Sequence, residues 1–583
     1  MHFIIISKKN NTFKINDKYL KSNNAPTLIS KTFKKMEIKN FIVYCYNYTH
    51  IDHEKENYSF YCDKNRILLV NGLINVDNEI RDYDIVKFFN KLNDSSKLTG
   101  DYQLIKIDKN GNGFIKTPIF SIRQLFFYED ENCSVISTDP KLIVDGIEKF
   151  KEKKFVNHYD IKFIEDSIFN KLSVRKFPRN TIFKEIKRLF PNDKKKFING
   201  NIVIDTNIKI EAPKSFKKKY KENKEKLYDE YYNDLINFTD KNLKYLKPQL
   251  NKIVLGLTGG FDSRLTLSIF SNLCKKNNIA FETFVNGNDD NGDVIIANKI
   301  SKIVDVPHTQ NKPPGGKHKS PKTINDYMLV FYIGKGDFDS NNFDSSRKYI
   351  NDQHLLYING MDAYKRHDMD SIYSGNRWFA KRYLQDKNFF FPLFYTENEI
   401  FFALETTKNN PEGYKEFIYE ILKRSNPKLL EIPILGDNLP QTNIKPYLTK
   451  NLSNHEQEPF LWDYSFVRKN LKIILNENLN KKLGLKSKII IKIIGLNELD
   501  FFLNKKIYKI INAYRKEKIT LKLAIKKLIE EKSSQEYPKR KTMISMDGKN
   551  LKRKTIKNMR ILMDYASVAK MKSFQEIEKE LKI

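Results

Sequence analysis

One short stretch, residues 252–270, constrains the fold and the chemistry of this chain more than any other. It opens with an apolar run at 253–257 that predicts a buried strand, and apolar residues at helical spacing resume from residue 264. Between them, Thr258-Gly259-Gly260 breaks the pattern. Glycines let a ligand approach the backbone closely, and the first N–H groups of a helix point into such a turn. The stretch therefore predicts an anion site.

Three side chains of this turn extend the prediction from an anion to a polyphosphate. Thr258 and Ser263 add hydroxyl donors, and Asp262 puts a carboxylate where a magnesium ion on a polyphosphate would lie. The alternative is an ordinary turn after a strand, which the glycine pair alone would not exclude.

The six residues 258–263, Thr-Gly-Gly-Phe-Asp-Ser, resemble the SGGxDS pyrophosphate loop of the N-type ATP pyrophosphatases, and the flanking LGLTGGFDSRLTL resembles their asparagine synthetase branch. These proteins split ATP into AMP and pyrophosphate, so the resemblance implies ATP and Mg²⁺ as cofactors. It implies catalytic roles for Asp262 and Ser263, with Asp262 as a metal ligand. The nucleotide-binding residues that it implies here are Leu257, Thr258, Gly259, Gly260, Asp262 and Ser263.

Length, charge and cysteine content narrow the class of protein. The 583 residues are too many for one core and predict two or three domains. The formal net charge of +33 would suit a nucleic-acid or other anionic partner, but the lysines mix with acids along the whole chain, which favours a general composition bias.

Four cysteines without CxxC spacing predict reduced thiols. No apolar run reaches the roughly 20 residues of a membrane span. Nothing resembles a signal peptide either, so we expect a soluble, cytoplasmic protein.

Residues 1–210 are rich in short strand-like runs, which predicts antiparallel sheets. Four segments fall in the order found in the glutamine-amidotransferase domain of asparagine synthetase, so the resemblance implies an Ntn-hydrolase-like α+β sandwich. They are NGLIN at 71–75, LTGDY from residue 98, RQLFFY at 123–128 and STDPKLI at 137–143. The runs are Phe3–Ile6, Phe41–Tyr46, Arg66–Val70, Tyr102–Ile107, Gly113–Lys116, Gln124–Tyr128, Ser134–Ser137 and Asn201–Ile204.

The catalytic residues of that domain are missing. The amidotransferases use an N-terminal cysteine as the nucleophile, whereas position 2 is His2 and none of the four cysteines is near the N-terminus. Leu73 stands where the family has a glutamate that holds the substrate glutamine. We therefore expect a degenerate domain that keeps the fold but has no glutaminase activity.

The second half of the chain predicts a doubly wound parallel sheet. After the turn and its helix, Phe281–Val285 predicts a second buried strand and residues 293–304 a second helix. This order places ligands at the carboxyl ends of the strands. By the resemblance, Asn286 and Leu257 contact the adenine. The loop at 309–321 is either a flap over the nucleotide or an ordinary surface loop.

A third strand is predicted at Leu355–Ile358, and it ends in Asn359-Gly360-Met361-Asp362, where asparagine synthetase has SGxGxDE. Asn359 and Gly360 match positions that contact the nucleotide. Met361 replaces a glutamate tied to aspartate activation, which argues against free aspartate as the substrate. Asp362 is either a displaced magnesium ligand or a plain turn residue.

The sequence thus predicts four regions: a degenerate amidotransferase-like domain at 1–210, a solvated linker at 211–226, an ATP pyrophosphatase domain at 227–480 with a helical C-terminal part, and a basic helical extension at 481–583. Within the third region, an apolar stripe predicts a first helix that ends before Pro248.

We expect a ligase that activates a carboxylate as an acyl-adenylate for attack by ammonia or an amine. The missing glutaminase matches family members that form β-lactam rings or cyclise lasso peptides, and a sugar acid and a peptide remain open as substrates. The alternatives are a tRNA-modifying ATP pyrophosphatase, which the basic charge favours, and an inactive scaffold, which the altered loop after Ile358 favours. A homodimer is open as the oligomeric state.

Overall fold

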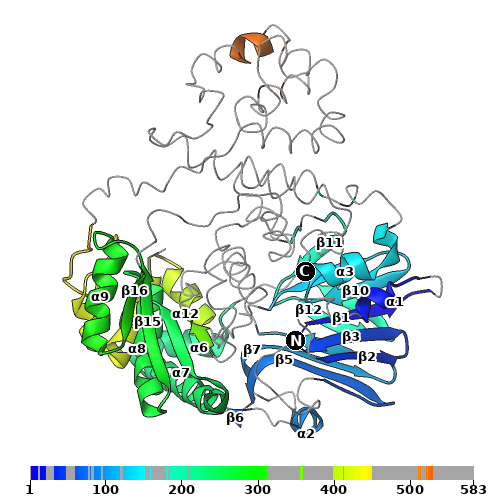
Figure 1. Cartoon of the computed structure of the whole chain (residues 1–583), viewed down its shortest axis with the longest axis horizontal. Coiled ribbons are helices and arrows are strands. Elements are labelled where there is room, and N and C mark those ends of the chain that lie inside the picture. Colours follow the sequence, from blue (N-terminus) through cyan, green and yellow to red (C-terminus); the bar gives the residue numbers. More distant parts are fainter. Residues whose placement is uncertain are drawn as a thin grey trace. The chain divides into compact units, whose positions relative to one another are not determined.

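The computed structural model describes residues 2–206, except 11–12, 22–31, 48–59, 77–78, 81–83, 93–95, 97, 119–122, 152–157, 159, 161–178 and 182. It also describes 211–311, 355–358, 398–448 without 411, and 510, 513, 520 and 523–528. The chain divides into two compact units, one formed by Met1–Glu148, Glu185–Gly315 and Ser345–Ser453, the other by Lys149–Lys184, Gly316–Asp344 and Asn454–Ile583. The first unit holds nearly all the described elements (Figure 1). In the second, a helical stretch at 523–528 buries Ala524 and Leu528.

Antiparallel sheets form in the N-terminal part of the chain, as the strand-like runs predict (Figure 1). In one sheet the order is β11-β9-β10-β1-β3-β2, with bounds Ile186–Leu189, Leu125–Glu129, Cys133–Ser137, His2–Lys8, Phe41–Asn47 and Thr32–Ile38. In the other the order is β13-β12-β8-β7-β5-β4, with bounds Asn201–Asp205, Lys194–Ile198, Gly113–Lys116, Leu98–Asp108, Arg66–Val76 and Phe60–Cys62, and β6 (Glu79–Ile80) pairs with β5.

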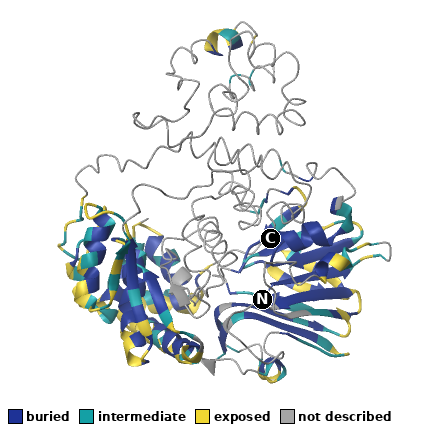
Figure 2. Ribbon diagram, in the orientation of Figure 1, coloured by how far each residue is buried: buried dark blue, intermediate teal, exposed yellow. Residues whose placement is uncertain are grey.

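The two sheets share an apolar core because side chains alternate between the faces of each strand. On β7, Ile105 and Ile107 join a buried cluster with Phe3 and Ile5 of β1. On its other face, Leu104 belongs to a separate cluster with the aromatic residues of α2 (Ile85–Lys91). Figure 2 shows this burial along the strands. The short helices α1 (Asp17–Leu20) and α3 (Pro140–Gly146) pack against each other. The finer Ntn-hydrolase-like arrangement stays a prediction.

Strand β12 was not predicted because its sequence, KKKFI, does not alternate between apolar and polar residues. Its burial nevertheless alternates, and Lys195, 3% exposed, faces inward. The Lys195 ammonium donates to Thr117 Oγ1 at 3.1 Å and to the carbonyl oxygens of Pro191 and Asp193 at 3.0 and 2.8 Å. A lysine can occupy an inward position when its charged end is hydrogen-bonded in this way.

A separate, wholly parallel sheet follows, in the order β16-β15-β14-β17. The strands are His308–Asn311, Ala280–Asn286, Lys252–Gly256 and Leu355–Ile358, which confirms the strands predicted at 253–257, 281–285 and 355–358. Helix α8 (Phe261–Lys276) joins β14 to β15, and α9 (Gly292–Val304) joins β15 to β16. The mixed α/β class is confirmed, while helices on both faces, as in a doubly wound sheet, stay a prediction.

The passage at 211–226 differs from the solvated linker that its lysines predict. It contains helix α6 (Lys214–Glu222), and Ala212 and Phe216 are buried in the same apolar core as the parallel sheet. Phe216 packs edge-on against Phe402 of α12 (Asn398–Thr407), with ring centroids 5.1 Å apart. Tyr220 of the same helix also packs against this core, so two aromatic residues anchor a short lysine-rich helix whose lysines can stay in water.

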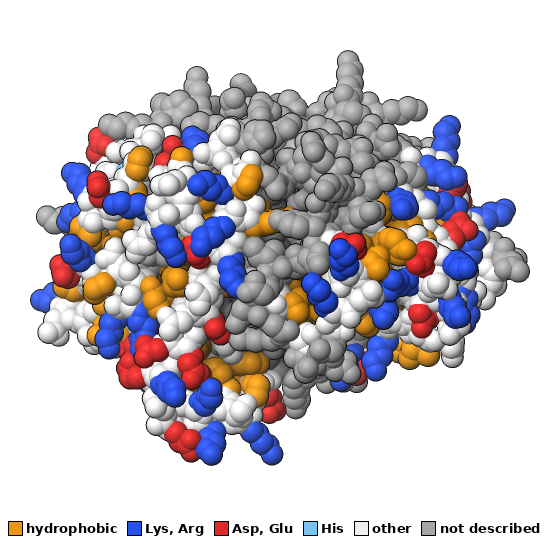
Figure 3. Space-filling model, turned by 90° about the horizontal axis from the view of Figure 1, so that it is seen from below, with side chains coloured by type: hydrophobic (Ala, Val, Ile, Leu, Met, Phe, Trp, Pro, Cys, Tyr) orange, Lys and Arg blue, Asp and Glu red, His pale blue; other side chains and the backbone are white. Residues whose placement is uncertain are grey.

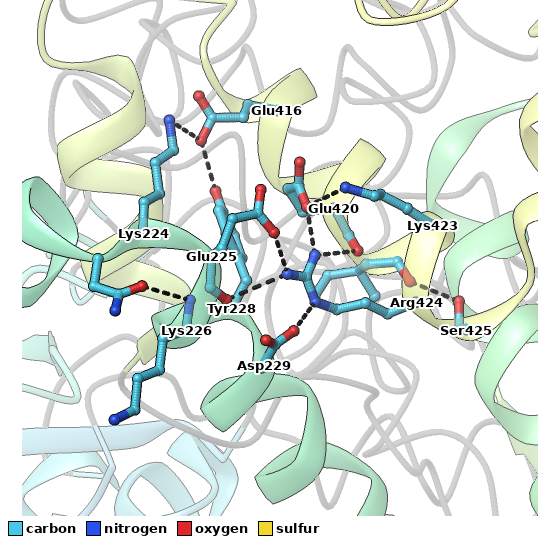
Figure 4. Close-up of polar contacts among 12 residues, drawn as sticks. Lys224, Glu225, Lys226, Tyr228, Asp229, Glu416, Glu420, Lys423, Arg424 and Ser425 are labelled. Atoms are coloured by element: carbon cyan, nitrogen blue, oxygen red, sulfur yellow. Dashed lines mark hydrogen bonds and ion pairs between the residues drawn. The ribbon is translucent and has the colours of Figure 1, made fainter.

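Helix α7 (Lys224–Leu246) has the predicted apolar stripe and ends before Pro248. It is joined to α13 (Tyr414–Ser425) by Arg424, which donates to Glu225 and Asp229 at 2.7 Å each and to Glu420 (Figure 4). Burial alone would lower the pKa of Arg424, but these three carboxylates raise it above its usual value. The far end of α7 holds α8: Asp240 accepts from Lys276 at 3.1 Å and from the Asn277 amide at 2.6 Å.

Figure 3 shows one face of the molecule, on which Lys and Arg side chains are spread with Asp and Glu among them. Of the helices that the described residues form, none combines the length and the apolar character needed to cross a bilayer.

Candidate functional site

The glycine turn at 258–263 lies where the strand order of the parallel sheet reverses. The chain passes from β14 outward through β15 to β16, and β17 then pairs with the other side of β14. Leu255 is in register with Thr283 of β15 and with Ile358 of β17, so the carboxyl ends of these strands meet at one edge. In open α/β sheets, this reversal is where ligands bind.

Helix α8 begins directly after the glycines, at Phe261, and its N-cap residue, Gly260, provides no side-chain cap. Asp262 lies in the first turn and is half-buried. Ser263 is 3% exposed, and its Oγ accepts the Thr258 N–H at 3.0 Å and lies 3.0 Å from Thr258 Oγ1. Ser263 therefore fixes the shape of the turn.

Gly259 is held on three sides. Its N–H donates to Asp293 Oδ1 of α9 at 2.7 Å, and its carbonyl accepts the Leu435 N–H at 3.1 Å. A Cβ added at Gly259 would lie 2.9 Å from Leu435 Cβ and 3.2 Å from Ile296 Cδ1. The fold itself therefore requires glycine at this position.

Gly260 differs from its neighbour. Its backbone angles, φ −86° and ψ −176°, suit any residue, and among the described residues an added Cβ would meet only Thr258 Oγ1, at 3.6 Å. Its N–H reaches Thr258 Oγ1 at a long 3.4 Å. No contact in the described part of the chain requires glycine here, although glycine is a better N-cap than alanine.

Arg264, the first residue after the turn motif, holds the segment that closes on Gly259. It is fully buried, and its guanidinium donates to the carbonyl oxygens of Leu429, Ile432 and Pro433 at 3.0, 2.7 and 2.8 Å. Burial lowers the pKa of Arg264 to about 10. These bonds fix the backbone from η7 (Pro427–Glu431) to Pro433, two residues before Leu435.

The first turn of α13 lies near the turn motif. Burial raises the pKa of Tyr414, and the negative charges of Asp437 and Asp262 act in the same direction. The next residue, Lys415, is 3% exposed and pairs with Asp437 at 2.6 Å and Glu412 at 2.9 Å. Burial alone would lower the pKa of Lys415, but these carboxylates raise it, so the buried ammonium stays charged.

The structure brings together the predicted residues that it describes. Leu257 to Ser263 follow β14, and Asn286 ends the neighbouring strand β15, exposed at the same edge. Asn359, Gly360 and Asp362 lie outside the described residues, as does most of the loop at 309–321.

Sequence reasoning missed three contributors: Asp293, Arg264 and Leu435. Asp293 had a local signal, since it follows Asn291, a good helix N-cap, just beyond a strand end. Arg264 and Leu435 had none, because their roles depend on a contact between segments about 170 residues apart in the chain.

The N-terminal sandwich holds a second polar group, made of Asn71, Gln103 and Arg123. The Asn71 amide donates to Gln103 Oε1 at 2.8 Å, the Gln103 amide to the Arg123 carbonyl at 3.1 Å, and the Arg123 guanidinium to Asn71 Oδ1 at 3.1 Å. All three residues are at most 6% exposed. We call this closed set the polar ring.

On the same two strands as Asn71 and Gln103, Asn75 and Thr99 face each other in register, and their buried side-chain polar atoms form no hydrogen bond to the described residues. An ordered water is the usual partner of such groups.

Within the described ranges, no three His, Cys, Asp or Glu side chains are grouped to hold a metal ion. Magnesium on a nucleotide needs fewer, since one or two carboxylates and the phosphates suffice. Comparison of the sequence with protein-family models and with curated proteins finds no match.

Proposed function

We propose that this protein is an ATP-dependent ligase that activates a carboxylate as an acyl-adenylate and passes the acyl group to nitrogen. The glycine turn would bind the pyrophosphate part of ATP. Its place at the carboxyl end of β14, where the strand order reverses, supports this assignment, as does a helix N-terminus without a side-chain cap.

The observation that carries the proposal is the difference between the two glycines. Gly259 is required by the fold, since a Cβ there would collide with Leu435. Gly260 has permissive backbone angles, and among the described residues only Thr258 Oγ1 lies within 4 Å of an added Cβ, at an ordinary contact distance of 3.6 Å. A glycine that the fold does not need is expected where a ligand must approach the backbone closely.

The chain's own groups divide the work as follows. The N–H groups at the start of α8 would hold the pyrophosphate, while Ser263 and Thr258 keep the turn in shape. Asp262 would hold a magnesium ion carried by the triphosphate, which neutralises charge on the leaving group. Arg264 keeps the segment up to Leu435 in place behind the turn.

The reaction would have two steps. A carboxylate oxygen of the substrate attacks the α-phosphorus of ATP, the bond from that phosphorus to the bridging oxygen breaks, and pyrophosphate leaves. The nitrogen nucleophile then attacks the acyl carbon, AMP leaves with the oxygen to which the acyl group was attached, and nitrogen loses a proton to solvent. Positioning and charge stabilisation would supply most of the rate enhancement.

We propose further that the nitrogen comes from ammonia or an amine supplied from outside the N-terminal domain. By the resemblance, Leu73 replaces the glutamate that holds glutamine. In the polar ring, both polar atoms of the Asn71 side chain, Nδ2 and Oδ1, already form hydrogen bonds with the protein. Asn71 lies in the segment that resembles the amidotransferase NGEIYN strand.

Paired glycine variants test the nucleotide site. For Gly260→Ala we expect an unfolding free energy within about 0.5 kcal/mol of wild type, because the reduced freedom of the unfolded chain offsets the poorer N-cap. Its Kd for Mg·ATP should rise at least tenfold in calorimetry. Gly259→Ala should instead unfold about 2 kcal/mol more easily, because its Cβ overpacks against Leu435.

Activity is tested by pyrophosphate release with pools of sugar acids and carboxylate peptides, each with ammonia and with amines. We expect release that falls at least a hundredfold in Asp262→Ala and is unchanged in Asp290→Ala, an exposed aspartate in the nearby loop. No ATP binding by the wild-type protein would leave the inactive scaffold as the explanation. Tight, steeply salt-dependent tRNA binding would favour the tRNA-modifying alternative.

A further inference from the structure

Asp293 makes the only contact to the Gly259 N–H that the described residues provide. The donor and acceptor are 2.7 Å apart, and a carboxylate acceptor makes this bond stronger than one between neutral groups. The N–H has a single proton, so it cannot serve a phosphate oxygen at full strength while Asp293 holds it. Asp293 must therefore either compete with the ligand for the turn or fix the turn for the ligand.

The surroundings of Asp293 hold it in place without a ligand. It lies in the first turn of α9, where the helix dipole favours a carboxylate, and its own N–H donates to the Asn291 side chain at 2.9 Å. Asn291 packs close to Gly287, where an added Cβ would lie 2.8 Å from Asn291 Nδ2. Moving Asp293 would disturb the start of α9.

Gly259 is equally confined on its other side. Its carbonyl accepts the Leu435 N–H, and Leu435 belongs to the segment that Arg264 holds through three carbonyls. The peptide groups on either side of Gly259 thus have fixed orientations. The next N–H groups, from Gly260 into the first turn of α8, belong to a helix start that has no side-chain cap.

We propose that Asp293 is a positioning residue, which holds the Gly259 N–H so that the following N–H groups of the turn converge on the pyrophosphate of ATP. This deepens the proposed function and rests on it. The carboxylate acts through the Gly259 backbone and does not itself contact the phosphates.

The test measures binding of magnesium pyrophosphate and of Mg·ATP to the full chain by calorimetry, with thermal unfolding of each variant in parallel. Asp293→Ala should weaken both affinities at least tenfold. Asp293→Asn should stay within threefold of wild type, because the amide oxygen can still accept the Gly259 N–H. Asp290→Ala, three residues away and exposed, is the matched control and should change nothing.

Asp293→Glu covers the case in which the alanine variant does not fold. It keeps the charge but displaces the carboxylate by one methylene, so positioning predicts weaker binding and a KM for ATP that rises more than kcat falls. Tighter binding in Asp293→Ala would overturn the proposal by showing competition, and unchanged binding would overturn it as well. If wild type binds neither probe, the proposed function itself fails, which the wild-type titration alone reveals.

Discussion

The two polar groups of the first unit differ in how completely the protein satisfies them. In the polar ring, Asn71, Gln103 and Arg123 bond to one another in a closed set and are almost fully buried. In the glycine turn, Gly259 is held on three sides, whereas a Cβ on Gly260 would meet only Thr258 Oγ1 among the described residues, and Thr258 is exposed. Buried groups that satisfy each other stabilise a fold, whereas groups held firmly from behind and open in front suit a ligand. The contrast supports our proposal that the chemistry takes place in the parallel-sheet part of the chain.

We expect the largest loss of stability when the hydrogen bonds of Arg264 behind the turn are removed. Arg264→Met keeps much of the side-chain volume but leaves the carbonyls of Leu429, Ile432 and Pro433 without their donor. We expect unfolding to become about 3 kcal/mol easier, since each buried acceptor loses part of its satisfaction. Denaturant unfolding measures this, and Mg·ATP binding should weaken as well. A variant as stable as wild type would show that the segment up to Leu435 does not depend on Arg264.

In the polar ring we expect a substitution to lower stability without changing turnover. Gln103→Ala leaves the Asn71 amide without its acceptor in a buried site, so we expect a loss of roughly 2 kcal/mol in the free energy of unfolding. Pyrophosphate release, corrected for the folded fraction, should not change. A specific loss of turnover in this variant would break the comparison, because it would give the N-terminal sandwich a part in the reaction.

We expect the smallest loss of stability from a change to Asp240, which contacts the C-terminal end of α8. Burial acts to raise the pKa of Asp240, but hydrogen bonds from Lys244, Asn277 and Lys276 outweigh it and lower the pKa to about 2. A lowered carboxyl pKa contributes stability that is present above the unfolded value of 3.8 and is lost as pH falls toward 2. Asp240→Asn should therefore cost about 1–2 kcal/mol at pH 7 and almost nothing near pH 2.

Urea unfolding of the wild type and of Asp240→Asn at several pH values measures this pH dependence. ATP binding at pH 7 should be the same in both. A cost that does not change with pH would mean that packing, and not charge, ties α7 to α8.

Local pattern was sufficient for the elements that carry the turn. The apolar run at 253–257 and the glycines after it predicted β14, the break and α8, because strand burial, glycine freedom and helix periodicity are properties of neighbouring residues. The same held for β15 and β17. It failed for β12, whose inward Lys195 is satisfied by backbone carbonyls, and for α6, which Phe216 and Tyr220 anchor.

By itself, then, the sequence determined where the turn is and which residue types line it. Only the tertiary structure decided how the two glycines differ, because that difference depends on Asp293, Ile296 and Leu435, which reach Gly259 from other segments. The role of Arg264 also depends on the tertiary structure. In the sequence it is only a charged residue within a helical pattern, whereas in the folded protein it donates to three carbonyl oxygens. Contacts between distant segments leave no periodic trace in a single sequence, and so they become visible only when the chain is folded.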